Sequence, residues 1–196
     1  MIRMLLIGPP GAGKGTQARH ITEKHGIVAI STGDIFRQNV KSQSPLGRAA
    51  ESYMNAGKFV PDTITNEMVR DRLNQPDAQD GFLLDGYPRT AAQVGFLDEA
   101  LAGMGHKLDV VLQLVVDRDE LVQRLLRRAV SENRTDDTAE VIRERMALYF
   151  EQTTSVTSLY SERGLLTKVE GIGTVSHVAQ RVSTALDVKL GASLTL

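Results

Sequence analysis

A glycine-rich segment near the N-terminus carries the strongest chemical signal in this sequence. It reads Gly8-Pro-Pro-Gly-Ala-Gly-Lys14-Gly-Thr16, directly follows the apolar residues 4–7 and precedes a helical pattern. Glycines let backbone N–H groups turn toward phosphate oxygens, the positive end of a helix dipole favours an anion, and a lysine adds a point charge. The segment therefore predicts a binding loop for the phosphates of a nucleoside triphosphate.

The spacing Gly8-x4-Gly13-Lys14 matches the P-loop pattern up to the lysine. Gly15 stands where this motif usually has a Ser or Thr that binds Mg²⁺, and Thr16 carries the hydroxyl one residue later. The motif alone leaves open whether the phosphate goes to water, to a second substrate or nowhere. The residues expected to contact the triphosphate are Gly11, Ala12, Gly13, Lys14, Gly15 and Thr16.

A second polar group follows the apolar run 82–84. Asp85 stands at the tip of this expected strand, where a carboxylate beside a P-loop can order Mg²⁺ or its waters. Taken alone, Asp85 is also compatible with a helix cap or a turn. Arg89 lies just beyond the strand, where its planar guanidinium could bind a phosphate with two hydrogen bonds.

Apolar runs of strand length alternate with segments of helical period along the chain. The expected strands are residues 4–7, 27–30, 82–84, 110–116 and 165–169, and the expected helices are 14–25, 62–74, 90–103, 118–129, 138–162 and 174–188. Continuous apolar strands are typical of parallel sheets covered on both faces, so the pattern predicts a three-layer α/β fold with a five-stranded parallel sheet. Ligands then bind at the carboxyl ends of the strands. Residues 31–60, broken at Ser44-Pro45, and 129–137 interrupt the alternation and are expected to be inserts.

Composition restricts the class of protein. The chain has 196 residues, of which 41 % are hydrophobic and 24 % charged, as in ordinary folded proteins. A net charge of −1 provides no field for a nucleic acid or an anionic membrane. The absence of cysteine excludes disulfides, thiolate zinc sites and a cysteine nucleophile. No apolar run reaches the roughly 18 residues of a membrane span, or the roughly seven that a signal peptide needs before Gly8. We expect a cytoplasmic protein that binds neither nucleic acid nor membrane.

Four motifs in this order make the chain similar to the adenylate kinases, which are nucleoside monophosphate kinases with a P-loop. They are Gly8 to Thr16, Ser31-Thr-Gly-Asp-Ile-Phe-Arg37, Asp85-Gly-Tyr-Pro-Arg89 and Arg134-Thr-Asp-Asp137. The chain resembles the short-lid, bacterial-like type from residue 1 to about 186. The resemblance implies a monomeric transferase of adenine nucleotide metabolism that moves the terminal phosphate of Mg·ATP reversibly to AMP, giving two ADP. The short, cysteine-free lid implies no zinc.

The resemblance also implies a division of the chain and a role for single residues. The core comprises 1–30, 61–126 and 138–190, with an AMP-binding insert at 31–60, a lid at 127–137 and a tail at 191–196. The AMP site falls on Thr32, Arg37, Lys58, Phe59, Val60, Gly86, Tyr87, Pro88, Arg89 and Gln93. Within it, Arg37 and Arg89 hold the phosphate. Gln93 faces the adenine edge, because an amide donates and accepts at once.

The arginines of the second half admit two interpretations. Seven arginines and seven acidic residues lie between 118 and 145, which predicts helical ion pairs such as Glu120 with Arg124. Arg124 and Arg128, however, are four residues apart, where like charges repel, and this spacing indicates an anion between them. The resemblance places Arg124 on the adenine of ATP, near the backbone of Gly171 to Gly173. It assigns catalysis to Lys14, Arg89, Arg128, Arg134 and Arg145. Arg118, Arg127 and Arg143 are expected at the surface, and the four histidines receive no role.

Three other functions remain to be compared with this one. A P-loop switch GTPase requires Asn-Lys-x-Asp to read guanine, and no such run occurs. A UMP or CMP kinase could use the same scaffold, although Gln93 and Thr32 favour adenine. A non-catalytic ATP-binding protein would not need so complete a set of arginines.

Overall fold

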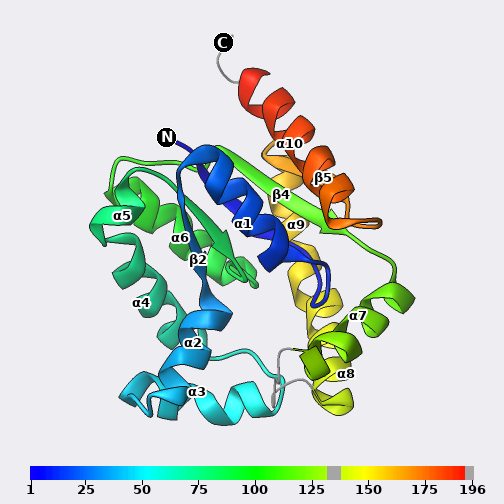
Figure 1. Ribbon diagram of the computed structural model, residues 1–196. Coiled ribbons are helices and arrows are strands. Elements are labelled where there is room, and N and C mark those ends of the chain that lie inside the picture. Colours follow the sequence, from blue (N-terminus) through cyan, green and yellow to red (C-terminus); the bar gives the residue numbers. More distant parts are fainter. Residues whose placement is uncertain (132–137, 193–196) are drawn as a thin grey trace.

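The computed structural model describes residues 1–131 and 138–192, with side chains for 1–127 and 138–191 (Figure 1). At its centre lies one parallel sheet of five strands in the order β2-β3-β1-β4-β5. The strands are β1 (Arg3–Ile7), β2 (Val28–Ser31), β3 (Phe82–Asp85), β4 (Val110–Val115) and β5 (Leu166–Glu170). The predicted α/β fold with a five-stranded parallel sheet is therefore confirmed.

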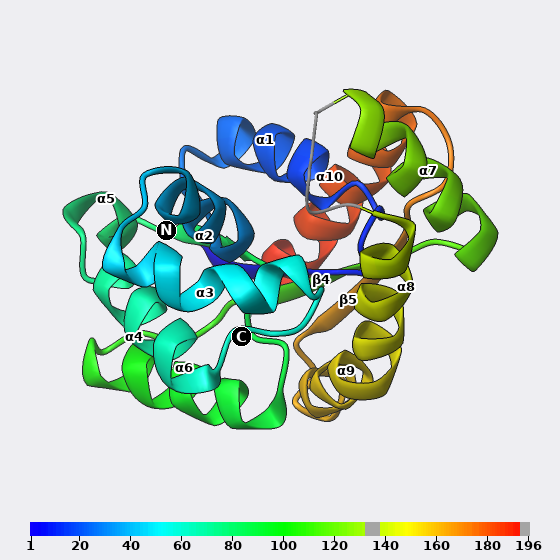
Figure 2. The same ribbon diagram turned by 90° about the horizontal axis from the view of Figure 1, so that it is seen from below.

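Helices cover both faces of the sheet (Figure 2). One face packs against α1 (Lys14–His25), α7 (Arg118–Ser131), α8 (Ala139–Leu148) and α10 (Val175–Ala192), and the other against α4 (Asp62–Leu73), α6 (Ala91–Gly103) and α9 (Thr154–Glu162). Successive side chains of β1 alternate between the two cores: Leu6 packs with the first set of helices and Leu5 with the second. Burying each such leucine stabilises the fold by roughly 1.5–3 kcal/mol. Apolar packing on both faces explains why the strands are continuous apolar runs in the sequence.

The expected helix 138–162 is present, but it is not uniform. Between α8 and α9 lies a π-helical segment, η1 (Tyr149–Thr153), with hydrogen bonds over five residues instead of four. A single such turn leaves no period in the sequence that would distinguish it from an α-helix. The short helix α5 (Pro76–Gln79) was not predicted either, because four residues are too few to establish a period.

The expected insert 31–60 contains two helices, α2 (Thr32–Lys41) and α3 (Pro45–Asn55). The side chain of Ser44 caps α3 by accepting the N–H of Gly47 (3.0 Å), which confirms the predicted break at Ser44-Pro45. The two helices pack closely, since a Cβ on Gly47 would lie 2.1 Å from the carbonyl oxygen of Asn39. They project from the carboxyl ends of the strands on one side, and α7 and α8 do so on the other (Figure 1).

The register of the sheet brings the candidate residues to one edge. Asp85 at the end of β3 lies beside Leu6 of β1 and Ser31 of β2. The loop that begins at Gly8, the start of α2 and the loop after β3 therefore meet at the carboxyl edge, as expected for a parallel α/β sheet. Across 1–131 and 138–192, none of the helices has the length and apolar character needed to cross a membrane.

Candidate active site

A cleft of about 770 Å³ opens at the carboxyl ends of the strands. It is lined by the loop after β1, the starts of α1 and α2, the segment before α4, the loop after β3, and parts of α7, α8 and η1. The predicted site residues that it brings together are Gly11, Gly13, Lys14, Gly15, Thr16, Thr32, Arg37, Lys58, Phe59, Val60, Asp85, Gly86, Tyr87, Pro88, Arg89, Gln93, Arg124 and Arg145.

Four predicted site residues are not among those that line the cleft. Ala12 is buried in the core, 2 % exposed, and its N–H donates to the carbonyl of Pro9 (3.1 Å). Gly173 lies in the loop after β5, where its φ of 115° requires glycine. The side chain of Arg128 and the whole of Arg134 lie outside the described residues, as does most of the expected lid. The predicted roles of Arg128, Arg134 and the lid stay predictions.

The loop after β1 forms one end of the cleft. Gly11 and Gly13 have φ values of 83° and 88°, in the left-handed region that glycine occupies without strain. The ammonium of Lys14 donates to the carbonyls of Gly8 (2.8 Å) and Pro9 (3.2 Å). The first turn of α1 contains no acidic residue, so nothing in that turn neutralises the positive end of the helix dipole. The loop, the lysine and the helix end together suit an anion.

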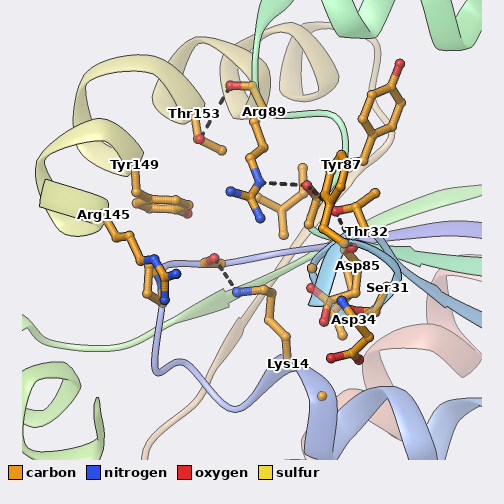
Figure 3. A pocket seen from close by; sticks show the side chains of 18 of the residues that line it. Lys14, Ser31, Thr32, Asp34, Asp85, Tyr87, Arg89, Arg145, Tyr149 and Thr153 are labelled. Atoms are coloured by element: carbon orange, nitrogen blue, oxygen red, sulfur yellow. Dashed lines mark hydrogen bonds between the residues drawn. The ribbon is translucent and has the colours of Figure 1, made fainter. Parts of the chain in front are cut away.

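Asp85 lies at the floor of the cleft, between Lys14 and Arg89 (Figure 3). Burial raises the pKa of this carboxyl, and the charges of Lys14 and Arg89 oppose the rise. Its Oδ1 is buried and has no hydrogen-bond partner among the described residues. An unsatisfied buried carboxylate oxygen beside a phosphate loop suits a hydrated cation or a metal-bound water.

The described residues contain no group of three or more His, Asp or Glu side chains that could hold a metal ion by themselves. A single carboxylate such as that of Asp85 is enough for Mg²⁺, which retains several waters and binds through one or two carboxylates together with substrate phosphates. Thr16 lines the same cleft and adds a hydroxyl. Asp85 and Thr16 are the residues of the cleft that could hold such an ion.

Arg89 points into the cleft from the loop after β3 (Figure 3). Its Nε donates to the carbonyl of Gly86 (2.7 Å), and its guanidinium lies 5.0 Å from the ring centre of Phe59. Burial lowers the pKa of Arg89 to about 10; Asp85 opposes this change, and Arg145 and Arg37 add to it. The group remains a cation at neutral pH, held near two other cations where an anion would relieve the repulsion.

Gly86 and Thr32 fix the shape of this end of the cleft. The hydroxyl of Thr32 donates to the carbonyl of Gly86 (3.1 Å), and a Cβ on Gly86 would lie 2.9 Å from that hydroxyl oxygen. Gly86 also has a φ of 82°. A side chain at this position would therefore displace both Thr32 and the Arg89 guanidinium. Arg37, on the next turn of α2, forms an ion pair with Asp34.

Arg124 makes the predicted ion pair with Glu120, with 2.8 Å between Nε and Oε1. It also donates from Nη1 to the carbonyl of Gly171 (3.0 Å), which joins α7 to the loop after β5. The predicted ion pair is confirmed, and the assignment of Arg124 to the adenine of ATP stays a prediction. Arg127 was expected at the surface; it is exposed, but it also lines the cleft because it lies one turn beyond Arg124.

The sequence did not identify Tyr149 and Thr153, which line the cleft from η1 beside Arg145 of α8 (Figure 3). Thr153 is 3 % exposed and donates to the main-chain carbonyl of Arg89 (3.4 Å). Burial raises the pKa of the Tyr149 hydroxyl. No sequence signal could have singled them out, because their direction depends on the π-helical turn.

Comparisons with known proteins agree with this geometry. A family model described as adenylate kinase matches residues 6–165. The adenylate kinase of Pseudarthrobacter chlorophenolicus is 61 % identical over 186 residues, 95 % of this chain and 97 % of the relative. Those of Renibacterium salmoninarum and Kocuria rhizophila are 59 % and 58 % identical over 187 residues, 95 % of this chain and 97 % and 100 % of the relatives. The matched region contains the glycine loop, the insert 31–60 and every described cleft residue, and the chain belongs to the adenylate kinase family.

Proposed function

We propose that this chain, a nucleotide-binding phosphotransferase by its family, transfers the terminal phosphate of Mg·ATP reversibly to AMP and forms two ADP. One observation carries the proposal. A single cleft is lined by the glycine loop and Lys14 and also by Thr32, Arg37, Arg89 and Gln93. Such an arrangement suits two nucleotides whose phosphates meet in the middle.

In the proposed donor half, the backbone of Gly11 to Thr16 and the Lys14 ammonium hold the triphosphate of ATP. Arg124 and the backbone around Gly173 hold its adenine. In the proposed acceptor half, Arg37 and Arg89 bind the phosphate of AMP, and the Lys58-Phe59-Val60 backbone and Gln93 contact its base. The contact of Arg124 with the carbonyl of Gly171 supports the donor assignment.

The proposed reaction needs no general base. The second pKa of a phosphate monoester is about 6, so AMP is mostly a dianion at neutral pH and can attack directly. In agreement, none of the four histidines lines the cleft. Catalysis then consists of aligning two polyanions, cancelling their repulsion and excluding water. We assign the cancelling charges to Lys14, Arg89, Arg128, Arg134 and Arg145.

Mg²⁺ bound with ATP supplies positive charge to the phosphate oxygens and fixes their geometry. Asp85 is proposed to hold it through water, and no zinc is proposed. We further propose that residues 31–60 form the AMP-binding insert and 127–137 a short lid on a core of 1–30, 61–126 and 138–190, in a monomeric cytoplasmic enzyme. The similarity to adenylate kinases and the projection of α2 and α3 beside the cleft support this division.

Asp85→Asn is expected to stabilise the protein without nucleotide while it slows transfer by about 100-fold or more. Because burial raises the folded-state pKa of Asp85, its ionised form is disfavoured by folding, and stability is lost as pH rises through that pKa. An asparagine removes this penalty at pH 7 to 8 but cannot order Mg²⁺ as well. Melting temperatures and transfer rates at saturating Mg·ATP test both parts. Asp71→Asn, an exposed position on α4, is the control. A lower melting temperature for Asp85→Asn than for the parent would contradict the argument.

The activity itself is tested by mixing the purified chain and Mg·ATP with AMP, UMP or CMP in turn and quantifying the diphosphates by chromatography. We expect ADP with AMP at a rate far above the diphosphates from UMP or CMP. Preference for UMP or CMP would indicate a pyrimidine nucleotide kinase on the same scaffold. No diphosphate from any acceptor would indicate an ATP-binding protein without catalysis.

A further inference from the structure

Gln93 lies at the inner wall of the cleft and is only 2 % exposed. Both ends of its side-chain amide are already bonded to the protein. Nε2 donates to Oδ1 of Asp62 (2.6 Å), and Oε1 accepts the main-chain N–H of Arg89 (2.7 Å). Asp62 does not line the cleft, so it contacts Gln93 on the side that faces away from the cleft.

Asp62 is itself held in place. Its second oxygen, Oδ2, accepts the hydroxyl of Thr90 (2.9 Å). The same hydroxyl oxygen accepts the backbone N–H of Gln93 (3.2 Å) as the N-cap of α6. Asp62 is the first residue of α4, and the network therefore joins the start of α4 to the start of α6. The carboxylate has little freedom to turn away from Gln93.

These partners permit one orientation of the Gln93 amide. A carboxylate only accepts hydrogen bonds, and a main-chain N–H only donates them. If the amide turned by 180°, its oxygen would face the Asp62 carboxylate and its NH₂ would face the Arg89 N–H. Both bonds would be lost and replaced by repulsion. In the observed orientation one N–H and one lone pair remain to contact a ligand, in a fixed order.

The order of donor and acceptor on the amide matters because purines differ in the order of the groups that pair with it. The adenine edge accepts at N1 and donates from the 6-amino group, whereas hypoxanthine donates from N1–H and accepts at its 6-oxo group. An amide that can rotate can form both hydrogen bonds with either base, and a fixed amide can form them with only one. We propose that Asp62 is a positioning residue that locks the Gln93 amide and makes the acceptor site select 6-aminopurine over 6-oxopurine monophosphates. This inference rests on the proposed function, in which Gln93 contacts the base of AMP.

The test is Asp62→Asn, assayed with AMP and with inosine monophosphate (IMP) as acceptors. Asparagine has the same shape, but its own amide can donate or accept, so that only the N–H of Arg89 still opposes the turned orientation of Gln93. We expect the ratio of kcat/KM for AMP to that for IMP to fall by roughly tenfold or more. The KM for ATP should stay within about twofold, because Asp62 lies behind the acceptor half only. An acid that merely stabilises the start of α4 would not change the preference between the two bases.

Four further variants separate the possible outcomes. Gln93→Ala should lower the AMP-to-IMP ratio, and the double variant with Asp62→Asn should have the ratio of Gln93→Ala alone. Asp71→Asn, on an exposed part of α4, should leave the ratio unchanged. Thr90→Val removes the hydroxyl that holds Asp62 and should shift the ratio in the same direction, which provides a second route to the result if Asp62→Asn folds poorly.

A ratio for Asp62→Asn within about twofold of the parent, with a lowered ratio for Gln93→Ala, would overturn the inference and leave the proposed function intact. Equal losses with AMP and IMP would also overturn it, because they indicate a structural role for Asp62. An unchanged ratio for Gln93→Ala would overturn both the inference and the assignment of Gln93 to the base.

Discussion

Replacing Lys14 by methionine should reduce phosphate transfer by about 1,000-fold and leave the fold intact. The ammonium lies at the mouth of the glycine loop, bonded to the carbonyls of Gly8 and Pro9, where no other side chain of the loop carries a charge. Methionine retains most of the apolar stem and removes only this charge. The measurement is kcat at saturating nucleotides, together with the melting temperature of the variant.

Lys24→Met provides the matched control. Lys24 is on the same helix, α1, but pairs with Asp187 at the surface (2.9 Å) and takes no part in the cleft. An exposed pair of this kind contributes little to stability, so activity and melting temperature should change little. If Lys14→Met kept more than about a tenth of the parent activity, the phosphate role of the loop would be wrong.

Arg89→Ala should weaken AMP far more than ATP. We expect kcat/KM for AMP to fall by about 100-fold or more and the dissociation constant of ATP to change by less than about threefold. The reason is local, because Arg89 belongs to the loop after β3 and is held there by Gly86 and Phe59, not by the glycine loop. Arg89→Lys should recover little, because an ammonium cannot form the paired hydrogen bonds of a guanidinium. Steady-state kinetics with each nucleotide varied in turn, and calorimetry with each alone, provide the values.

Arg70→Ala is the control. Arg70 of α4 also stacks on a phenylalanine, Phe96 (4.6 Å to the ring centre), but it is exposed and pairs with Glu67 (2.8 Å). It lies outside the cleft, and its removal should leave both nucleotide affinities unchanged. Equal losses of AMP and ATP binding in Arg89→Ala would show that the two halves of the cleft are misassigned.

The sheet and the glycine loop were predictable because their determinants are local. A strand buried on both faces must be apolar throughout, so β1, β3 and β4 are visible as continuous runs. Asp85 is recognisable because a carboxylate immediately follows such a run. The loop is recognisable because phosphate binding requires glycines and a lysine at fixed spacing, whatever the rest of the fold does.

The rest of the cleft depends on contacts between segments far apart in the sequence. Asp62 reads as an ordinary acid in the first turn of a helix, and only the packing of α4 beside α6 places it against Gln93, 31 residues away. Arg127 reads as a surface residue because nothing in the sequence gives the rotation of α7 relative to the cleft. Thr153 also could not be identified from the sequence, because it contacts the main chain of Arg89, 64 residues away.

The π-helical turn between α8 and α9 has a geometric consequence for the cleft. Each residue of a regular α-helix advances the side-chain direction by 100°, so residues eight apart would point about 80° away from each other. Arg145 and Thr153 are eight apart, yet both face the cleft with Tyr149 between them, because the wider turn compensates for this drift (Figure 3). The number of residues in this stretch is therefore itself a constraint. If the same number of residues wound as ordinary α-helix, Thr153 would point about 80° away from Arg145, and its hydroxyl would no longer be aimed at the backbone that it supports.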